Sequence, residues 1–338
     1  MRTGKISVFT AALLAMVFIT GGMAEAKKPI TLKFAGINPV EHSSTVEMKK
    51  MAKNIEKETN GEVKVRVFPA GQLGDYTLVY EEITKGTIDM ALIPIPTEYE
   101  PKHQITLVPC LAKDYNDVKK IFAKNGWLYN TVDKLHKNLD VVFLGFQIEG
   151  FGGIGSVNKI NDPLNPKTPK NMLCRISTME LDKFVLDALN YATVTVPYSD
   201  LYTALQTGVV EGWYGGAAVH SYQGYRDVLK NYYNFNLFVE AYQLVVSKKS
   251  WDKLTPEQQA VITKDADILC KNSITIAEKE ENEYLKKMKE AGMNVYVYTA
   301  EELTPINERV KKVVWPKLDK LLGKELTNDL MKQFAADK

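Results

Sequence analysis

Hydrophobic and polar positions in the first part of the chain predict strands that alternate with helices. An apolar strand is expected at 31–37, and a helix follows whose apolar residues recur at i, i+3, i+4 and i+7 from Met48. Residues 62–68 alternate valine with charged residues, as in a half-buried strand. A second helix that ends near Gly86 and a strand at 88–93 complete the pattern. This alternation is typical of an α/β fold with a largely parallel sheet.

The two ends of the first helix carry local signals. Ser44 and Glu47 have the spacing of a capping box, in which both side chains bind free backbone N–H groups at a helix start. Asn60-Gly61 predicts the helix end, because such residues enter the left-handed conformation at low cost.

The same alternation continues in the second half of the chain. Strands are expected at 141–147, 193–196 and 209–214, and helices at 179–190 and 199–207. Ligands of such sheets bind at the carboxyl ends of the strands. No repeat and no low-complexity linker separates the halves. We therefore expect two lobes that are joined by crossing strands.

One predicted helix, at 256–291, is unusually long. Thr255 and Gln258 have capping-box spacing, Pro256 occupies the favoured first position, and neither Pro nor Gly follows until Gly292. Such a helix would be on the order of 50 Å long, which exceeds one small lobe. We expect it to pack on both lobes. The alternative is two helices with a break near 271–273.

The N-terminus predicts export. Arg2 and Lys5 precede an apolar run at 6–19, and an Ala-x-Ala pair ends at Ala26. This order is typical of a secretory signal peptide, 1–26, that is cleaved after Ala26. The apolar run is shorter than the roughly 20 residues of a spanning helix, and no later run is long enough. We expect a periplasmic protein without direct membrane insertion.

Charge, cysteine and histidine usage narrow the possible partners. The formal net charge is +2, which gives no broad field for nucleic acid or an anionic membrane. The three cysteines (Cys110, Cys174 and Cys270) are far apart and odd in number, so free thiols are favoured over a single disulfide. The four histidines show no metal-ligand spacing. No metal and no cofactor is expected.

Several runs resemble the substrate-binding proteins of tripartite ATP-independent periplasmic (TRAP) transporters. They are Thr59-Asn60-Gly61-Glu62, Phe68-Pro69-Ala70-Gly71-Gln72-Leu73-Gly74-Asp75, Gly86-Thr87-Ile88-Asp89-Met90, the stretch from Tyr202 to Gly212, Cys174-Arg175-Ile176, and the stretch from Trp251 to Gln259. The runs occur in the family's order and span nearly the whole exported chain. Their agreement in order makes the resemblance strong, although each run alone is weak.

The resemblance implies a two-lobed α/β fold like that of class II periplasmic binding proteins. Lobe I would comprise 27–147 and 240–280, and lobe II 148–239 and 281–338, with the long helix shared by both. The lobes would close over a small organic acid, and the protein would deliver it to a membrane-embedded TRAP permease driven by an ion gradient.

Arg175 is the main candidate for ligand binding. It stands in a predicted short strand after the loop 162–172, where the family carries its carboxylate-binding arginine. A guanidinium presents a planar fork that meets a carboxylate with two charge-assisted hydrogen bonds, and it does not deprotonate. The alternative is an arginine in an ordinary surface salt bridge, which contributes little.

The run 150–155 matches G-x-G-x-x-G, but a dinucleotide site also needs a helix directly after the glycines. The following residues are extended and rich in turn formers, so we reject that interpretation. The glycines are expected instead at a lobe crossing where backbone approaches the ligand, with Phe151 and Gly153 at the ligand. Gly153 stands where many family members carry a second arginine.

Aromatic residues are the other expected contacts. Trp213 and Tyr214 follow Glu211-Gly212, where the family has a polar residue, and Tyr198 falls where the family places a ring on the ligand. With Gly153, they predict a roomier, more aromatic cavity that takes a carboxylate with an apolar or aromatic part. The alternative for Trp213 and Tyr214 is ordinary packing between lobes.

Asn38, after the first strand, and Asp75, after the glycine-rich turn, are weaker candidates for polar contacts with the ligand. The tyrosines near 232–235 resemble a surface that stacks nucleic-acid bases, but no basic patch accompanies them.

A binding protein is the main hypothesis, because no enzyme motif occurs. The sequence has no serine nucleophile elbow, no Cys–His pairing suggested by spacing, and no phosphate loop. Two alternatives stay open. One is an exported hydrolase or lyase that uses carboxylates in the cleft, and the other is a ligand-sensing partner of a membrane receptor.

Overall fold

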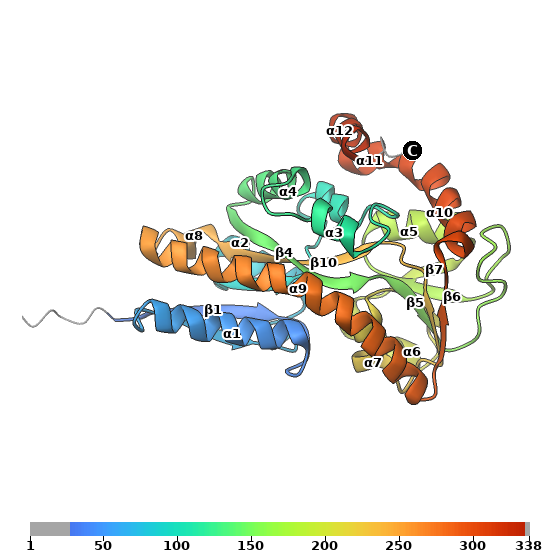
Figure 1. Cartoon of the computed structure of the whole chain (residues 1–338), viewed down its shortest axis with the longest axis horizontal. Coiled ribbons are helices and arrows are strands. Elements are labelled where there is room, and N and C mark those ends of the chain that lie inside the picture. The colour runs from blue at the N-terminus through green and yellow to red at the C-terminus, as the bar shows by residue number, and fades with distance from the viewer. Residues whose placement is uncertain (1–27, 335–338) are drawn as a thin grey trace, which may run out of the picture.

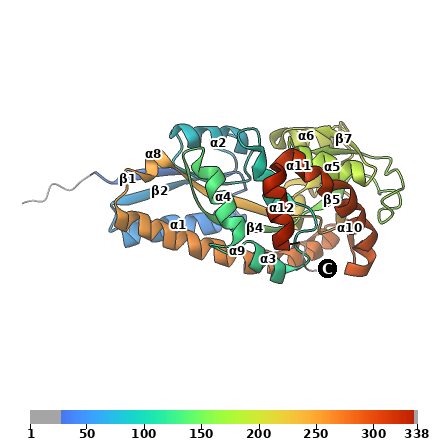
Figure 2. The ribbon, with the colours of Figure 1, turned by 90° about the horizontal axis from the view of Figure 1, so that it is seen from above.

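The computed structural model describes residues 28–334 and shows two lobes, each built around its own sheet (Figures 1 and 2). The expected signal peptide and its cleavage after Ala26 lie outside the described residues. The two-lobed α/β fold predicted from the sequence is confirmed.

The first sheet has three parallel strands and two that come from the crossing segments. Its order is β2 (Val63–Phe68), β1 (Ile30–Gly36), β3 (Met90–Ile93), β10 (Val239–Ser247), β4 (Val141–Phe151). Strands β2 and β3 pair in parallel with β1, whereas β10 runs antiparallel to both of its neighbours.

The second sheet has the same construction. Its order is β11 (Asn294–Val297), β9 (Asn231–Asn234), β5 (Gly153–Ser156), β8 (Gly212–Gly215), β6 (Leu173–Ile176), β7 (Ala192–Thr195). Here β5 is the strand that runs antiparallel to its neighbours. Strands β10 and β5 are each the first strand after the chain has crossed from the other lobe, which explains why these two are reversed.

Helices cover both sheets. Those of the first lobe are α1 (Ser43–Glu58), α2 (Tyr76–Lys85), η1 (Pro101–Leu107), α3 (Tyr115–Ile121), α4 (Trp127–Lys137) and α8 (Lys248–Trp251). Those of the second lobe are α5 (Glu180–Ala188), η2 (Tyr198–Asp200), α6 (Leu201–Gln206), α7 (Ala218–Tyr225) and α10 (Ala300–Val314). The C-terminal elements are η3 (Trp315–Lys317), α11 (Leu318–Leu322) and α12 (Lys324–Phe334). Helix α11 packs on η1, so the C-terminal segment contacts the first lobe as well as the second.

The start of α1 differs from its prediction. The N-cap is His42, whose Nδ1 lies 3.2 Å from the backbone N of Ser44. Ser44 does not cap the helix, because its hydroxyl bonds the side chain of Asn38 at 2.9 Å, and Glu47 pairs with Lys50 instead of the backbone. The capping box predicted at Ser44 and Glu47 is therefore wrong.

Other local predictions for this helix are confirmed. Its apolar stripe, which begins at Met48, is buried. Asn60 and Gly61 follow the helix end with φ of 50° and 80°, in the left-handed region. Gly86 likewise ends α2 with φ of 81°.

The long helix α9 (Pro256–Glu290) is continuous over 35 residues and spans both lobes (Figure 1). Its capping box at Thr255 and Gln258 is present. It packs on α1 and β4 in the first lobe and on α7 and β11 in the second. Ser273 joins α9 to β4, because its hydroxyl accepts a hydrogen bond from the backbone N of Ile148 at 2.9 Å. The prediction of one unbroken helix is confirmed.

The lobes are connected where β4 leads into β5 and where β9 leads into β10. The two crossing segments are hydrogen-bonded to each other, since Gly152 N donates to Phe238 O at 2.8 Å and Leu237 N donates to Gly152 O at 3.2 Å. A side chain at Gly152 would meet the ring of Phe238 at 2.2 Å. Glycine at this position is therefore required by the close approach of the two crossings.

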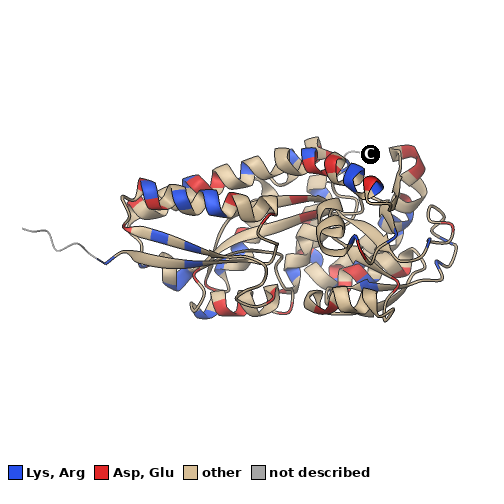
Figure 3. Cartoon of the chain, turned by 90° about the horizontal axis from the view of Figure 1, so that it is seen from below, with Lys and Arg blue, Asp and Glu red and all other residues tan. Residues whose placement is uncertain are grey.

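Basic and acidic residues are interspersed over both lobes (Figure 3). Within residues 28–334, no helix is long and apolar enough to cross a membrane. The three cysteines are free thiols, as predicted.

Candidate functional site

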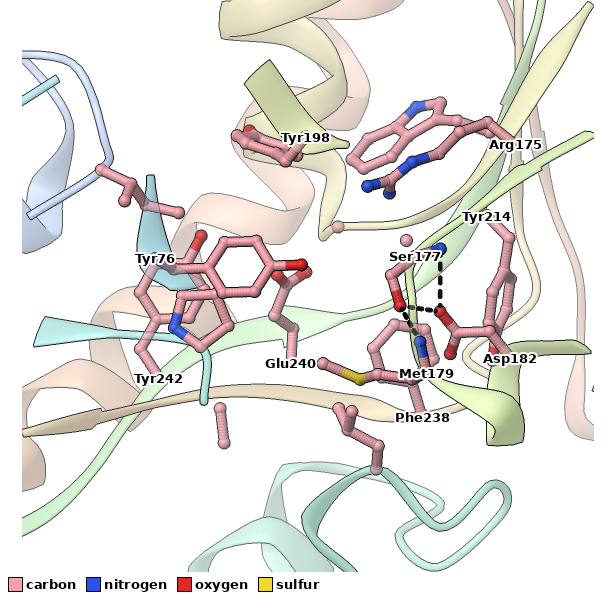
Figure 4. Close-up of a pocket in the computed structure, with 17 residues that line it drawn as sticks. Tyr76, Arg175, Ser177, Met179, Asp182, Tyr198, Tyr214, Phe238, Glu240 and Tyr242 are labelled. Atoms are coloured by element: carbon pink, nitrogen blue, oxygen red, sulfur yellow. Dashed lines mark hydrogen bonds between the residues drawn. The ribbon is translucent and has the colours of Figure 1, made fainter. Parts of the chain in front are cut away.

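A cavity lies between the lobes, at the strand ends that the α/β fold predicts. It encloses about 80 Å³ (Figure 4). Ile37 follows β1, Pro94 follows β3, Ser177 follows β6, and Gly215 ends β8, so four parallel strands direct their carboxyl ends to it. The start of β10 contributes Glu240 from the crossing segment. Residues of both lobes thus line one cavity.

Arg175, on β6, points its guanidinium into this cavity (Figure 4). The side chain is 4% exposed, and its Nε donates to the carbonyl of Val196 at 2.8 Å. That bond fixes the plane of the guanidinium and leaves its two terminal nitrogens available to a ligand in the cavity. Among residues 28–334, no carboxylate oxygen lies within 4.0 Å of this guanidinium. A buried cation in such surroundings favours an anionic ligand.

Two acidic residues, Asp182 and Glu240, also line the cavity, and the sequence did not reveal them. Burial raises the pKa of Asp182, whose carboxylate accepts from the Ser177 hydroxyl at 2.6 Å. Burial raises the pKa of Glu240 to about 7, and the backbone N of Ala217 donates to its Oε2 at 3.1 Å. Both groups can accept hydrogen bonds from a ligand, and in the protonated form both can donate one.

The remaining wall is aromatic and apolar. The structure places Tyr198, Trp213 and Tyr214, the aromatic candidates of the sequence, in the lining of the cavity. Trp213 is 2% exposed, and its ring lies 5.1 Å from that of Tyr225 and 6.5 Å from that of Tyr198. Trp213 therefore packs against aromatic rings of its own lobe and also forms part of the cavity wall.

Gly153 and Phe151 do not reach the cavity, contrary to prediction. A side chain at Gly153 would meet the carbonyl of Tyr233 at 2.6 Å and the hydroxyl of Tyr232 at 2.7 Å. The space expected to be left by the missing arginine is therefore filled. Phe151 is 3% exposed and packs against Tyr115 with ring centroids 5.3 Å apart. The expectation of a roomier cavity is wrong at this position.

Asn38 and Asp75 line a neighbouring cavity of about 390 Å³, which shares Ile37, Tyr76 and Tyr198 with the first. Asp75 is the N-cap of α2, and its carboxylate accepts from two backbone N–H groups of that helix. Both bonds go to Oδ1, so one carboxylate oxygen of Asp75 serves the helix cap. The Asn38 side chain is 3% exposed and belongs to a buried polar cluster.

That polar cluster was not visible in the sequence. It joins His42, which precedes α1, Glu149 on β4, and His220 on α7, with Asn38 donating to Glu149 Oε1 at 3.1 Å. The rings of His42 and His220 are stacked, with centroids 5.2 Å apart. Burial lowers the pKa of His42 to about 4, lowers that of His220 well below its usual value, and raises the pKa of Glu149.

Two α/β lobes, a connecting pair of crossing strands and an enclosed interlobe cavity define the architecture of a solute-binding protein. The chain belongs to the bacterial extracellular solute-binding proteins of family 7, whose profile matches residues 34–319. The resemblance to TRAP solute-binding proteins is thereby confirmed.

Individual relatives match over nearly the full chain. The sialic acid-binding periplasmic protein SiaP of Vibrio cholerae is 23% identical over 337 residues, which cover 96% of this chain and 98% of that protein. The C4-dicarboxylate-binding periplasmic protein DctP of Rhodobacter capsulatus is 26% identical over 313 residues, which cover 89% and 91%.

Solved structures show the same fold. A TRAP periplasmic solute-binding protein of Haemophilus influenzae with bound L-gulonate has a TM-score of 0.82 at 22% identity, and the match covers 91% of this chain and 100% of that one. A TRAP periplasmic solute-binding protein of Desulfovibrio salexigens with bound orotic acid has a TM-score of 0.81 at 18% identity, covering 90% and 97%.

Proposed function

We propose that this chain captures a small organic acid in the interlobe cavity and that Arg175 binds its carboxylate. The observation that carries the proposal is the buried guanidinium, which has no carboxylate within 4.0 Å among the described residues and points into an enclosed space. A ligand carboxylate would supply the missing negative charge through two charge-assisted hydrogen bonds. Solved relatives of the same fold carry carboxylates such as succinate and D-glucuronate.

The cavity wall supports a carboxylate with a compact apolar part and a hydrogen-bonding group. Tyr198 and Trp213 offer aromatic surface, and Met179 and Phe238 offer apolar surface. Asp182 and Glu240 would hydrogen-bond a hydroxyl, amine or second carboxyl group of the ligand.

Capture and release would follow from motion of the lobes about the two crossings, β4–β5 and β9–β10. These paired segments are the direct strand connections between the sheets, and the cavity lies beside them. The lobes would comprise 27–147 with 240–280 and 148–239 with 281–338. Closing would exclude water from the guanidinium and strengthen its attraction for the ligand.

The closed complex would deliver its ligand to a TRAP permease in the membrane. Membership of the solute-binding family supports this role, and so does the likeness to TRAP solute-binding proteins. The protein would act in the periplasm after cleavage of residues 1–26. It would bind its ligand without changing it.

The test is a titration of the exported chain, residues 27–338, with a panel of mono- and dicarboxylic acids in a calorimeter, followed by chemical analysis of each acid. We expect saturable binding of at least one acid and its recovery unchanged. Uncharged amides of the same acids are the matched ligands and are expected not to bind. Conversion of a bound acid into a product would support the hydrolase or lyase alternative. Equal binding of acid and amide would refute the role given to Arg175.

A further inference from the structure

We propose that His42, Glu149 and His220 form a binding site for a divalent transition-metal ion, with Zn²⁺ the best fit. The three side chains offer two imidazole nitrogens and one carboxylate oxygen that all lie within 4.8 Å of one another. All three residues are buried, at 0%, 3% and 4% exposure. This site adjoins the Arg175 cavity through Glu240 and Tyr242, but its three ligands do not line that cavity, and the proposal does not depend on the proposed function.

The separations fit a coordination sphere better than a hydrogen-bonded triad. His42 Nε2 lies 3.4 Å from Glu149 Oε2, and His220 Nε2 lies 3.5 Å from the same oxygen. Hydrogen bonds between nitrogen and oxygen are about 2.7–3.2 Å long, so both contacts are too long. Zn²⁺ binds such atoms at about 2.0–2.2 Å, which places two ligands of a tetrahedron roughly 3.3–3.5 Å apart. The two separations agree with that edge.

Donor atoms of both imidazoles face the gap. His42 Nε2 is buried and has no hydrogen-bond partner among the described residues. The partner of His220 Nε2, apart from Glu149, is the Tyr242 hydroxyl at 3.4 Å, which is also long for a hydrogen bond. An ion between these atoms would satisfy them together. Its positive charge would also offset that of the buried carboxylate, which has no Lys or Arg within 4.0 Å among residues 28–334.

Each ligand has a neighbour that can hold it in place. Ligating histidines generally donate the hydrogen on their other nitrogen to a carboxylate, hydroxyl or carbonyl oxygen. His42 Nδ1 lies 2.9 Å from the Ser44 hydroxyl, within hydrogen-bond distance. Glu240 Oε2 lies 3.6 Å from His220 Nδ1 and would have to move closer to accept its hydrogen. Metal binding at the two Nε2 atoms would place hydrogen on the Nδ1 atoms, so His42 would donate to the Ser44 hydroxyl in place of accepting from the backbone N of Ser44.

The site would connect the two lobes. His42 precedes α1 in the first lobe, and His220 stands on α7 in the second, while Glu149 lies on the crossing strand β4. The cavity of about 390 Å³ that is lined by His42 and His220 provides a route for an ion from solvent. A bound ion would hold the lobes together beside the crossings.

The experiment uses untagged protein that has been stripped with a chelator and dialysed, with no organic acid present. Zn²⁺ is titrated into it by calorimetry, and the stoichiometry is read by native mass spectrometry. We expect one Zn²⁺ per chain, and Co²⁺ in its place should give the strong visible absorption of a tetrahedral complex.

Two substitutions remove ligands with little change in shape, Glu149→Gln and His220→Asn. Loss of a residue that only contacts a metal ligand weakens metal binding by roughly 10–100-fold, so each of these two substitutions should weaken Zn²⁺ binding by more than that. Glu240→Gln, which changes such a contact, should weaken Zn²⁺ binding by roughly 10–100-fold. The matched control is His103→Asn, because His103 is also buried and its ring lies 4.4 Å from that of His136, outside the cluster. The control should bind Zn²⁺ as the unmodified protein does.

Circular dichroism of each metal-free variant establishes that it is folded, so that lost binding reports on the site. The proposal is overturned if the unmodified protein binds neither Zn²⁺ nor Co²⁺ stoichiometrically. It is equally overturned if folded Glu149→Gln and His220→Asn proteins keep full affinity, or if His103→Asn loses as much affinity as they do. None of these outcomes depends on whether an organic acid binds at Arg175.

Discussion

Replacing Arg175 with alanine should abolish tight binding of the organic acid while leaving the fold intact. The guanidinium is 4% exposed, and a carboxylate bound to it would also be buried. Removing one partner of a buried ion pair costs about 3–5 kcal/mol, because the other charge is left without compensation. At about 1.4 kcal/mol for each factor of ten, affinity should fall by roughly 140- to 3,700-fold.

Ligand-free stability should respond differently from affinity. The Arg175 side chain makes one hydrogen bond, from Nε to Val196 O, and among residues 28–334 no carboxylate lies within 4.0 Å of it. Loss of a single hydrogen bond costs about 0.5–1.5 kcal/mol, and relief of a buried charge offsets part of this. Affinity should therefore fall far more than the free energy of unfolding.

Calorimetry with the acid and denaturant unfolding without it measure the two quantities. Arg175→Lys keeps the charge but loses the fork, so its affinity should lie between those of the unmodified protein and Arg175→Ala. Arg309→Ala is the matched control, since Arg309 also donates from Nε to a backbone carbonyl, at 3.2 Å, but stands on α10 outside the cavity. Unchanged affinity in Arg175→Ala, or an equal loss in Arg309→Ala, would refute the reasoning.

Three further results are expected. Small-angle scattering should show a smaller radius of gyration when a binding acid is added, and unchanged dimensions would contradict hinged closure. Ser273→Ala should lower the free energy of unfolding by about 1–3 kcal/mol, because the buried N–H of Ile148 loses its acceptor. An unchanged denaturation midpoint would show that this hydrogen bond does not stabilise the protein. A thiol reagent at pH 8 should leave Cys110 and Cys174 nearly unmodified in the native protein, because burial raises the pKa of Cys110 to about 12 and that of Cys174 further. After unfolding the reagent should label three thiols, and fewer than three would reveal a disulfide.

The elements of the fold were predictable because their signals are local. Periodic apolar positions, the cap at Thr255 and the glycine that ends α2 act within a few residues, and all three appear in the structure as predicted. The capping box at Ser44 failed for the opposite reason. Asn38 and His42 occupy the Ser44 hydroxyl, and both of them also contact Glu149, more than a hundred residues away, which no local pattern reveals.

The candidate site was predictable only in part. Arg175 could be placed because it stands where the resembled family carries its carboxylate-binding arginine, and the structure puts it near the carboxyl end of β6, at the cavity. Gly153 was misplaced because the Tyr232 hydroxyl that fills its surroundings comes from a distant strand, β9. Asp182 and Glu240 carry no motif, and they enter the cavity only through the packing of α5 and the crossing of β10.

The histidine cluster was even less predictable from the sequence. Metal-ligand spacing was not found in the sequence because His42, Glu149 and His220 come from three separate elements. The interlobe crossing brings them together, and only the assembled structure reveals the separations on which the metal proposal depends.

Native mass spectrometry tests the central claim most directly, that a guanidinium between the lobes binds an organic acid. Unmodified protein and Arg175→Ala, each purified without refolding and incubated with the same carboxylic acids, are compared under identical conditions. The account predicts a complex with one acid per chain in the unmodified protein and its loss in the variant. Equal occupancy in both proteins, or no acid bound to the unmodified protein, would contradict it.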